Sequence, residues 1–239
     1  MKIIALESSA VTASVAVTED EKLLAQSFQN SGLTHSATLM PMAADLLKNA
    51  GLTLEEMDVV AVAAGPGSFT GVRIGVAAAK GLAWPGDKPC APCSTLESMA
   101  WQCAHMDGEI CAAMDARRDQ VYRARFLAEH GELKRLTEDR AVGLDTLAEE
   151  VLASNKPQIL VGDGARLVQQ VLEERGLPCA LMPPHLRYQT AWGVARAALR
   201  LAREGKLVSA ASMAPSYHRL SQAERERLEK LSPNVPLSG

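Results

Sequence analysis

The first twenty-five residues alternate between apolar runs and short polar segments. Residues 2–6 are apolar, residues 7–12 carry an acid, hydroxyl groups and small side chains, and residues 14–17 alternate. Three acidic residues at 19–21 separate this run from a further apolar stretch at 22–25. A period of two is typical of strands, and short polar clusters between such runs are typical of turns. The pattern therefore predicts an antiparallel meander.

The same order of features returns more than a hundred residues later. An apolar run at 110–114 leads into a polar turn at 115–120, a second strand-like run at 121–127, a turn at 129–131 and another run at 132–136. This repeat predicts a second meander.

A repeat of glycine turns follows the meanders in the same order. The apolar run 59–62 precedes a Gly-Pro-Gly turn at 65–67 and a helix-like segment, and the run 159–161 precedes a Gly-Asp-Gly turn at 162–164 and another helix-like segment. Two repeats in one order indicate duplication. We therefore predict an α/β fold of two duplicated lobes, each a mixed sheet flanked by helices.

Two helices are predicted in the first repeat. Residues 34–50 carry apolar side chains at helical spacing, and residues 71–84 form a second helix with Thr70 as its N-cap. This second helix is unusually rich in glycine and alanine, and because glycine is a poor helix former we expect these positions to serve close packing.

The repeats also predict the domain boundaries. The first lobe spans 1–104 and is completed by C-terminal helices at 190–231, in which 222–230 carries charge pairs at i,i+4 spacing. The smaller second lobe spans 105–189. The segment 232–239 is predicted to be disordered.

Composition narrows the class of protein. The chain of 239 residues is 47% hydrophobic and only 4% aromatic, with a net charge of −3. It has neither an apolar run long enough for a membrane span nor a recognisable leader, so we expect a cytoplasmic location without membrane contact. The slightly acidic balance predicts that this chain does not grip a nucleic-acid backbone alone, and any role on RNA is expected to need a partner.

The cysteines do not indicate a disulfide framework or a metal site. There are five of them, an odd number, and the pair Cys90 and Cys93 has no second pair of Cys or His to match it. We expect plain thiols.

Two polar turns are the main candidates for chemistry. The first holds Glu7, Ser8 and Ser9, and the second begins with Asp115. Facing one another across a cleft, they would offer backbone N–H groups and hydroxyls to phosphates and an acid to a metal ion. The alternative, which spacing alone favours, is that short polar residues only satisfy the geometry of surface turns. The glycine turn at 65–71 similarly suits either an anion at a helix N-terminus or a sharp strand-to-helix turn.

One stretch carries a specific resemblance. Residues 65–75 read Gly-Pro-Gly-Ser-Phe-Thr-Gly-Val-Arg-Ile-Gly and continue as Ala-Ala-Lys-Gly-Leu-Ala at 78–83. Here, and in the shorter motifs at 4–9, 34–36, 114–122 and 215–219, the chain closely resembles the TsaB family, over residues 3 to about 225. The resemblance implies the actin-like (ribonuclease H-like) fold. It also implies a subunit that binds and supports TsaD, which transfers a threonylcarbamoyl group to adenosine 37 of tRNA.

The resemblance also implies that this chain is not the catalyst. TsaD holds its metal with two histidines in a His-Leu-Glu-Gly-His type element, and the corresponding positions here are Thr95 and Met99. Neither replaces imidazole as a ligand, so no metal site and no catalytic residue are expected. Glu7 stands where the family has Asp, and its extra methylene is expected to push the carboxylate toward any phosphate. No cofactor is expected to bind tightly, with ATP or ADP only at the level of the complex.

Partners follow from the same resemblance. TsaD is expected to bind directly to the helices at 34–50 and 71–84, TsaE through the complex and tRNA indirectly, and the isolated chain could pair with itself. The alternative is that both helices are plain core helices. The side chains expected in the contact are His35, Leu39, Met42, Leu46, Val72, Gly75, Ala78 and Ala79. Two other functions stay open: a free-standing ATP-dependent phosphotransferase, and a metallopeptidase, which would need metal ligands that 95–99 do not supply.

Overall fold

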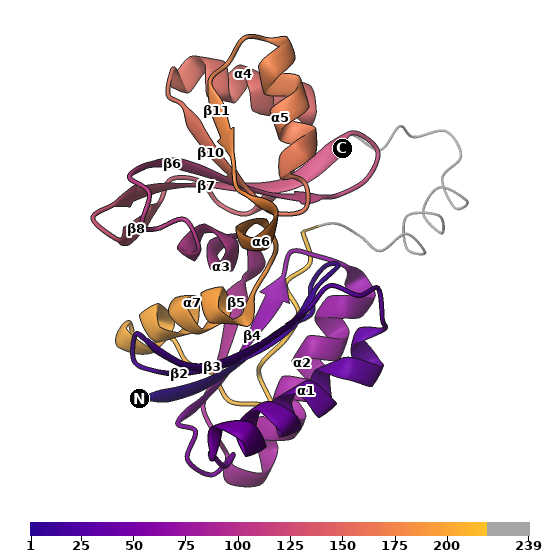
Figure 1. The fold of residues 1–239 in the computed structure, drawn as a ribbon, viewed down its shortest axis with the longest axis vertical. Coiled ribbons are helices and arrows are strands. Elements are labelled where there is room, and N and C mark those ends of the chain that lie inside the picture. Colours follow the sequence, from indigo (N-terminus) through magenta and orange to yellow (C-terminus); the bar gives the residue numbers. More distant parts are fainter. Residues whose placement is uncertain (219–239) are drawn as a thin grey trace.

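Two mixed β-sheets, one in each lobe, form the fold (Figure 1). The computed structural model describes residues 1–218, so the predicted helix at 222–230 and the predicted disordered tail at 232–239 lie outside the described residues. The first sheet has the order β3-β2-β1-β4-β5. Its strands are β1 Lys2–Glu7, β2 Ala13–Glu19, β3 Lys22–Gln29, β4 Val59–Gly65 and β5 Cys90–Ser94.

Strand β1 shows why the first sheet is covered on both faces. Ile4 and Leu6 pack into one hydrophobic cluster, whereas Ile3 and Ala5 pack into another on the opposite face. Successive side chains of a strand point to opposite faces, so a continuous apolar run marks a strand buried on both sides. β1 pairs antiparallel with β2 and parallel with β4, which makes the sheet mixed.

The second sheet repeats the order of the first. Its path β8-β7-β6-β10-β11 has an antiparallel meander followed by two parallel strands, as in β3-β2-β1-β4-β5. The additional strand β9 pairs with β7. This topology confirms the predicted α/β class of two mixed sheets flanked by helices. The strands are β6 Gly108–Asp115, β7 Gln120–Glu129, β8 Glu132–Arg135, β9 Arg140–Gly143, β10 Gln158–Val161 and β11 Cys179–Leu181.

Helices cover both sheets, and α3 and α6 lie between the two sheets (Figure 1). Helices α1 and α2 pack on one face of the first sheet and α7 on the other, and α4 and α5 cover the second sheet. The helices are α1 His35–Ala50, α2 Phe69–Ala83, the 3-10 turn η1 Trp84–Gly86, α3 Thr95–Trp101, α4 Leu144–Ser154, α5 Ala165–Glu174, α6 Pro184–Arg187 and α7 Ala191–Arg203. Among residues 1–218 no helix is long and apolar enough to cross a membrane.

Two details differ from the expectations. Helix α2 begins at Phe69 and is capped by Ser68, whose hydroxyl accepts a hydrogen bond from the backbone N–H of Gly71, so the prediction of Thr70 as the cap is wrong. Helix α3 was expected to belong to the first lobe, yet Leu96 and Met99 lie in the core of the second sheet. Helix α3 therefore connects the two lobes.

Each glycine turn packs against the polar turn of its own sheet. A Cβ on Gly67 would lie 2.4 Å from the carbonyl oxygen of Ser9, and one on Gly164 would lie 2.7 Å from the carbonyl carbon of Met114. Only glycine allows these close backbone approaches. The glycine turns therefore hold the two polar turns in place, which favours the interpretation of residues 65–71 as a structural turn.

Candidate functional site

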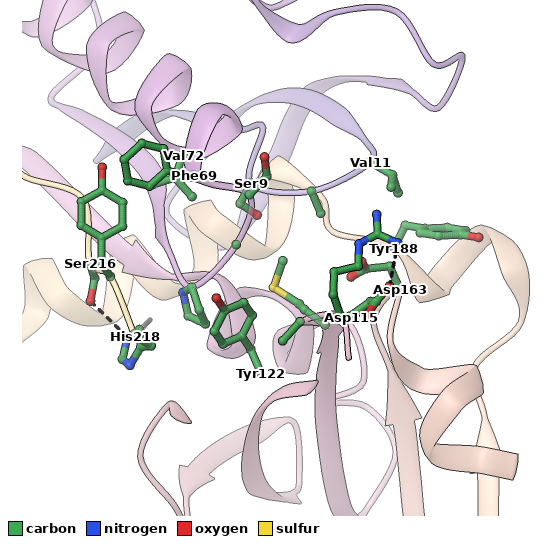
Figure 2. Close-up of a pocket in the computed structure, with 18 of the residues that line it drawn as sticks. Ser9, Val11, Phe69, Val72, Asp115, Tyr122, Asp163, Tyr188, Ser216 and His218 are labelled. Carbon is green, nitrogen blue, oxygen red and sulfur yellow. Dashed lines mark hydrogen bonds and ion pairs between the residues drawn. The ribbon is translucent and has the colours of Figure 1, made fainter. Parts of the chain in front are cut away.

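A cleft of about 840 Å³ lies between the lobes and contains the ends of both polar turns (Figure 2). The first lobe contributes the loop after β1 and the start of α2, the second lobe contributes the turn between β6 and β7, and the C-terminal segment forms a further wall. The lining residues are Ser9, Ala10, Val11, Asn30, Pro66, Gly67, Ser68, Phe69, Val72, Met114, Asp115, Ala116, Arg117, Tyr122, Asp163, Tyr188, Ser216, Tyr217 and His218. Of the four predicted turn residues, Ser9 and Asp115 line the cleft, whereas Glu7 and Ser8 lie beneath its surface.

The Glu7 carboxylate lies beneath the surface of the cleft. It is fully buried, and its Oε1 accepts hydrogen bonds from both the backbone N–H and the hydroxyl of Ser9, each at 2.6 Å. The carboxylate is therefore bonded to its own turn and is not exposed in the cleft, and the expectation that the longer side chain reaches toward phosphates stays a prediction. Burial raises the pKa of Glu7 to about 7, although the Ser9 hydrogen bonds oppose the shift.

Asp115 and the residues after it form a strained turn at the cleft mouth. Asp115 accepts a hydrogen bond from the backbone N–H of Arg117 at 2.7 Å and forms an ion pair with its guanidinium at 3.2 Å. Arg117, Arg118 and Asp119 all have positive φ angles, of 65°, 55° and 56°. Three consecutive non-glycine residues in the left-handed region are rare, and such outliers concentrate at functional sites.

Asp163 also lines this cleft, although it was not among the residues predicted from the sequence. It is the acid of the second glycine turn, and the only signal for it was its place between two glycines directly after a strand. Its carboxylate accepts a hydrogen bond from the side-chain amide of Gln189 at 2.6 Å. Burial raises the pKa of Asp163, and the charge of nearby Asp115 adds to the shift. The cleft floor is therefore acidic.

Residues 213–218, the C-terminal strap, form the wall beside α2. The backbone N–H of Ser216 donates to the carbonyl of Ala64 at 2.7 Å. The ring of Tyr217 stacks on Phe69 with 5.0 Å between centroids, and its hydroxyl accepts a hydrogen bond from Arg73 Nε at 2.7 Å. The guanidinium of Arg73 also lies 3.7 Å from the Phe69 ring centroid. The strap is thus packed into the lobe.

Most of the side chains expected at a partner contact lie in the core of this chain instead. Leu39, Leu46, Val72, Gly75 and Ala79 are buried against the first sheet. A partner cannot reach them in the folded subunit, so the choice of these five is wrong. The physical reason is that helical spacing identifies the apolar face of a helix but not what covers that face.

The other three expected contact residues are half-buried. Met42 and Ala78 pack against the edge of the same core. His35 Nε2 lies 2.7 Å from the carbonyl oxygen of Ala10, which ties the start of α1 to the cleft loop. The exposed faces of α1 and α2 are formed by other residues. The docking of a partner on these two helices stays a prediction.

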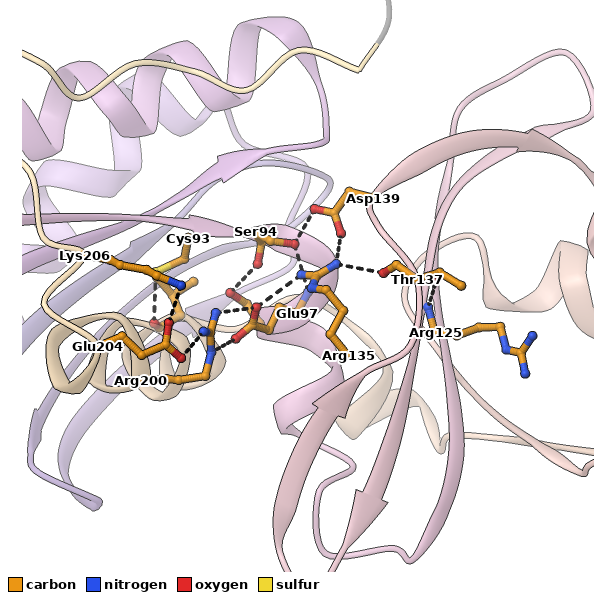
Figure 3. Close-up of polar contacts among 12 residues, drawn as sticks. Cys93, Ser94, Glu97, Arg125, Arg135, Thr137, Asp139, Arg200, Glu204 and Lys206 are labelled. Carbon is orange, nitrogen blue, oxygen red and sulfur yellow. Dashed lines mark hydrogen bonds and ion pairs between the residues drawn. The ribbon is translucent and has the colours of Figure 1, made fainter.

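Thr95 and Met99 are both fully buried in α3. Glu97, on the same helix, forms ion pairs with two arginines (Figure 3). Glu97 Oε1 accepts from Arg200 Nε at 2.7 Å, and Glu97 Oε2 pairs with Arg135 at 3.2 Å. Arg200 lies on α7 against the first sheet, and Arg135 ends β8 of the second sheet. The network therefore connects the lobes. Over residues 1–218, no three His, Cys, Asp or Glu side chains gather as a metal-binding group.

Comparisons with known proteins agree with this architecture. The family model of TsaD, tRNA N6-adenosine threonylcarbamoyltransferase, matches residues 23–226. A tRNA threonylcarbamoyladenosine biosynthesis protein TsaB from Bacillus subtilis is 34% identical over 73% of this chain and 76% of its own length. TsaB from Escherichia coli is 30% identical over 92% of this chain and 95% of its own length.

A solved structure supports the same relationship. The crystal structure of a Pseudomonas aeruginosa protein described as similar to the peptidase YEAZ superposes with a TM-score of 0.77 at 28% identity, covering 91% of this chain and 99% of that one. The family model and the curated relatives each span most of the sequence, and the predicted resemblance is confirmed. The chain belongs to the TsaB family, a branch of the wider family that the TsaD model describes.

Proposed function

We propose that this chain is a non-catalytic subunit of the machinery that makes threonylcarbamoyladenosine in tRNA, and that it binds and supports TsaD. Membership of the TsaB family supports the pathway. The observation that supports the non-catalytic role is the burial and ion pairing of the side chains of α3. Thr95 and Met99 are fully buried, and Glu97 between them is held by two arginines. This helix presents a packing surface and an ion pair where a metal-binding catalyst would need exposed ligands.

The outward faces of α1 and α2 are the proposed docking surface for TsaD. On α2 the exposed residues Arg73, Ala77 and Gly81 follow one another at i,i+4 spacing, and a Cβ on Gly81 would meet no atom within 4 Å. On α1 the exposed residues Met40 and Ala44 have the same spacing. Small residues let a partner helix approach closely, while a flanking Met adds apolar contact.

The remaining partners follow from this contact. TsaE reaches the chain through TsaD, TsaD recruits the tRNA to the complex, and no cofactor is held tightly by this chain alone. In the absence of TsaD, the same outward face would pair with a second copy of the chain.

The docking surface is tested with Ala77→Arg. The substitution puts a large charged side chain on the outward face, and we expect binding to TsaD, measured by calorimetry, to weaken by at least about tenfold because the partner helix can no longer approach. Ala153→Arg is the matched control, since Ala153 is an exposed alanine of α4 in the other lobe. Unchanged binding of Ala77→Arg would remove α2 from the contact.

The non-catalytic role is tested by reconstitution. We expect the purified chain to transfer no threonylcarbamoyl group to tRNA alone and to carry no stoichiometric zinc or iron. Adding TsaD should restore transfer. Transfer by this chain alone, together with stoichiometric metal, would contradict the proposal.

A further inference from the structure

All three tyrosines of the chain line one cleft. Tyr122 comes from β7, Tyr188 follows α6 and Tyr217 belongs to the C-terminal strap, and all three join Phe69 in the cleft wall. The whole sequence has only three tyrosines and is 4% aromatic. The gathering of all three tyrosines at one cleft is therefore not explained by an abundance of aromatic residues. The hydrophobic cores consist mainly of alanine, valine and leucine instead.

The tyrosine rings are held but not enclosed. Tyr122 packs one side against the core of the second sheet, and Figure 2 shows its ring near the middle of the cleft. Tyr188 is half-buried, and the next residue, Gln189, donates a hydrogen bond to the carboxylate of Asp163. Rings that are fixed on one side and accessible on the other are suited to stacking with a flat ligand.

The charges of the cleft decide which part of a ligand enters. The floor carries the carboxylate of Asp163, and the lining residues include no lysine and only one arginine, Arg117, which pairs with Asp115 at the mouth. A phosphate on this floor would face the Asp163 carboxylate with no cation of the cleft lining beside it. A neutral heteroaromatic ring with N–H donors has the opposite property, because carboxylates accept hydrogen bonds from such donors.

The cations lie at the mouth. The side chain of Arg117 is 86% exposed, and Arg118 follows it in the strained turn. A phosphate at the mouth can therefore pair with these exposed guanidinium groups, whereas a phosphate at the floor would face the Asp163 carboxylate. This is the reverse of a site that seats a phosphate chain at its base.

We infer that the cleft binds an unpaired nucleotide of RNA, with the base inside against the tyrosines and Asp163 and the phosphates at the mouth near Arg117. The inference rests on the proposed role in tRNA modification, which supplies the RNA. The volume of about 840 Å³ accommodates a base and its ribose. Recognition by stacking needs no strongly basic surface, so it is compatible with the net charge of −3.

The experiment measures binding of the full chain, without TsaD, to a fluorescently labelled unstructured RNA of about seven nucleotides. We expect the single strand to bind at least about tenfold more tightly than the same sequence as a duplex, because paired bases cannot enter the cleft. Adenosine should compete weakly, and ATP with magnesium no better than adenosine. RNA binding that is absent, or equal for single strand and duplex, would overturn the inference.

Variants locate the site. Tyr122→Ala and Tyr188→Ala should each weaken RNA binding by about tenfold, the loss of one stacking platform, while Tyr122→Phe and Tyr188→Phe keep most of the affinity. Arg117→Gln should reduce the salt dependence of binding by about one counterion. The melting temperature of each variant shows whether it is folded. If Tyr122→Ala unfolds, the comparison of Tyr188→Ala with the two Phe variants still tests the site.

Three further outcomes would contradict the assignment. Alanine variants that fold and bind RNA as the wild type does would place the RNA elsewhere. Adenosine binding as tightly as RNA would indicate a free nucleoside rather than a strand. Tight binding of ATP that exceeds adenosine would indicate a phosphate site. Since Tyr188→Ala should still bind TsaD, loss of the TsaD contact and loss of the RNA contact are measured separately, and either proposal can fail without the other.

Discussion

Burial and hydrogen bonding act in opposite directions on the carboxylate of Glu7. Removal from water disfavours the charged form, whereas the two hydrogen bonds from Ser9 favour it. Burial wins, and the negative charge of Asp163 adds to the upward shift of the pKa. One oxygen, Oε2, is buried without a hydrogen-bond partner among the described residues, which agrees with a carboxyl group that is costly to ionise.

The first prediction concerns the pH dependence of stability. The pKa of Glu7 is about 7 in the fold against an ordinary value of 4.5, so between these values the folded chain keeps a proton that the unfolded chain releases. Stability should therefore fall as the pH rises through this window, by roughly 3 kcal/mol for this group. We expect Glu7→Gln, which keeps the acceptor for Ser9, to lose this slope in urea unfolding from about pH 5 to about pH 8. The control is Glu149→Gln, at an exposed position, and an unchanged slope in Glu7→Gln would contradict the pKa.

The second prediction separates the two faces of α2. Ala79 is fully buried and Ala77 is exposed two residues earlier on the same helix. Ala79→Arg should abolish folding or lower the free energy of unfolding by several kcal/mol, roughly 3 to 5, because a charge is buried without a partner. Ala77→Arg should change it by less than about 0.5 kcal/mol. Thermal melts of the two variants measure the difference. An Ala79→Arg protein as stable as the wild type would show that the face of α2 that carries Ala79 is accessible to solvent.

At the scale of elements, α3 acts as the connection between lobes. Its apolar side chains divide between two cores, with Leu96 and Met99 on the second sheet and Trp101 on the first. Glu97 adds pairs with an arginine from each side. Burial lowers the pKa of the Arg200 guanidinium, but its hydrogen bonds and attraction to Glu97 outweigh this and raise the pKa overall.

The third prediction tests the network through Glu97→Ala. Removal of this carboxylate leaves Arg135 and Arg200 partly buried without a common partner, and we expect the free energy of unfolding to fall by about 2 kcal/mol, discounted from a fully buried pair because both arginines keep some contact with water. Glu149→Ala, an exposed glutamate on α4, should cost far less. Equal effects of the two substitutions in chemical denaturation would show that the network contributes nothing.

At the scale of the whole molecule, the duplication explains which features were predictable. Apolar runs of period two, polar turns and glycine turns repeat in order, and each is a local pattern, so both meanders, the strands before the glycine turns and helices α1, α2, α5 and α7 followed from the sequence. Strands β9 and β11 and helices α4 and α6 did not. The strap, Asp163 and the Glu97 pairs did not, because they depend on contacts between residues far apart in the chain. Ser216 meets Ala64, and Glu97 meets Arg200, only after folding. The inward and outward faces of α1 and α2 were likewise not distinguishable by periodicity.

The fourth prediction follows from the position of α3, whose side chains pack into the cores of both lobes. The tryptophans Trp84, Trp101 and Trp192 all lie in the first lobe or its supporting helices, whereas Met99 lies in the second core. If α3 couples the lobes, Met99→Ala should lower the midpoint of unfolding seen by tryptophan fluorescence as much as the midpoint seen by circular dichroism, with a cost of about 2 to 5 kcal/mol. Leu172→Ala, in the outer core of the second lobe, is the comparison. A fluorescence midpoint that stays in place would show that the lobes unfold independently.

The close contact between Gly65 and the strap has a practical consequence for how the protein is handled. A Cβ at residue 65 would lie 2.3 Å from the carbonyl oxygen of Ser216, so this backbone crossing holds Ser216 of the strap in the wall of the cleft. Met1, in contrast, pairs with Asp20 at the end of the first sheet remote from Glu7 and the cleft. An affinity tag or fluorophore fused before Met1 is therefore attached at the end of the first sheet away from the cleft. Assays of the cleft should carry their labels at the N-terminus.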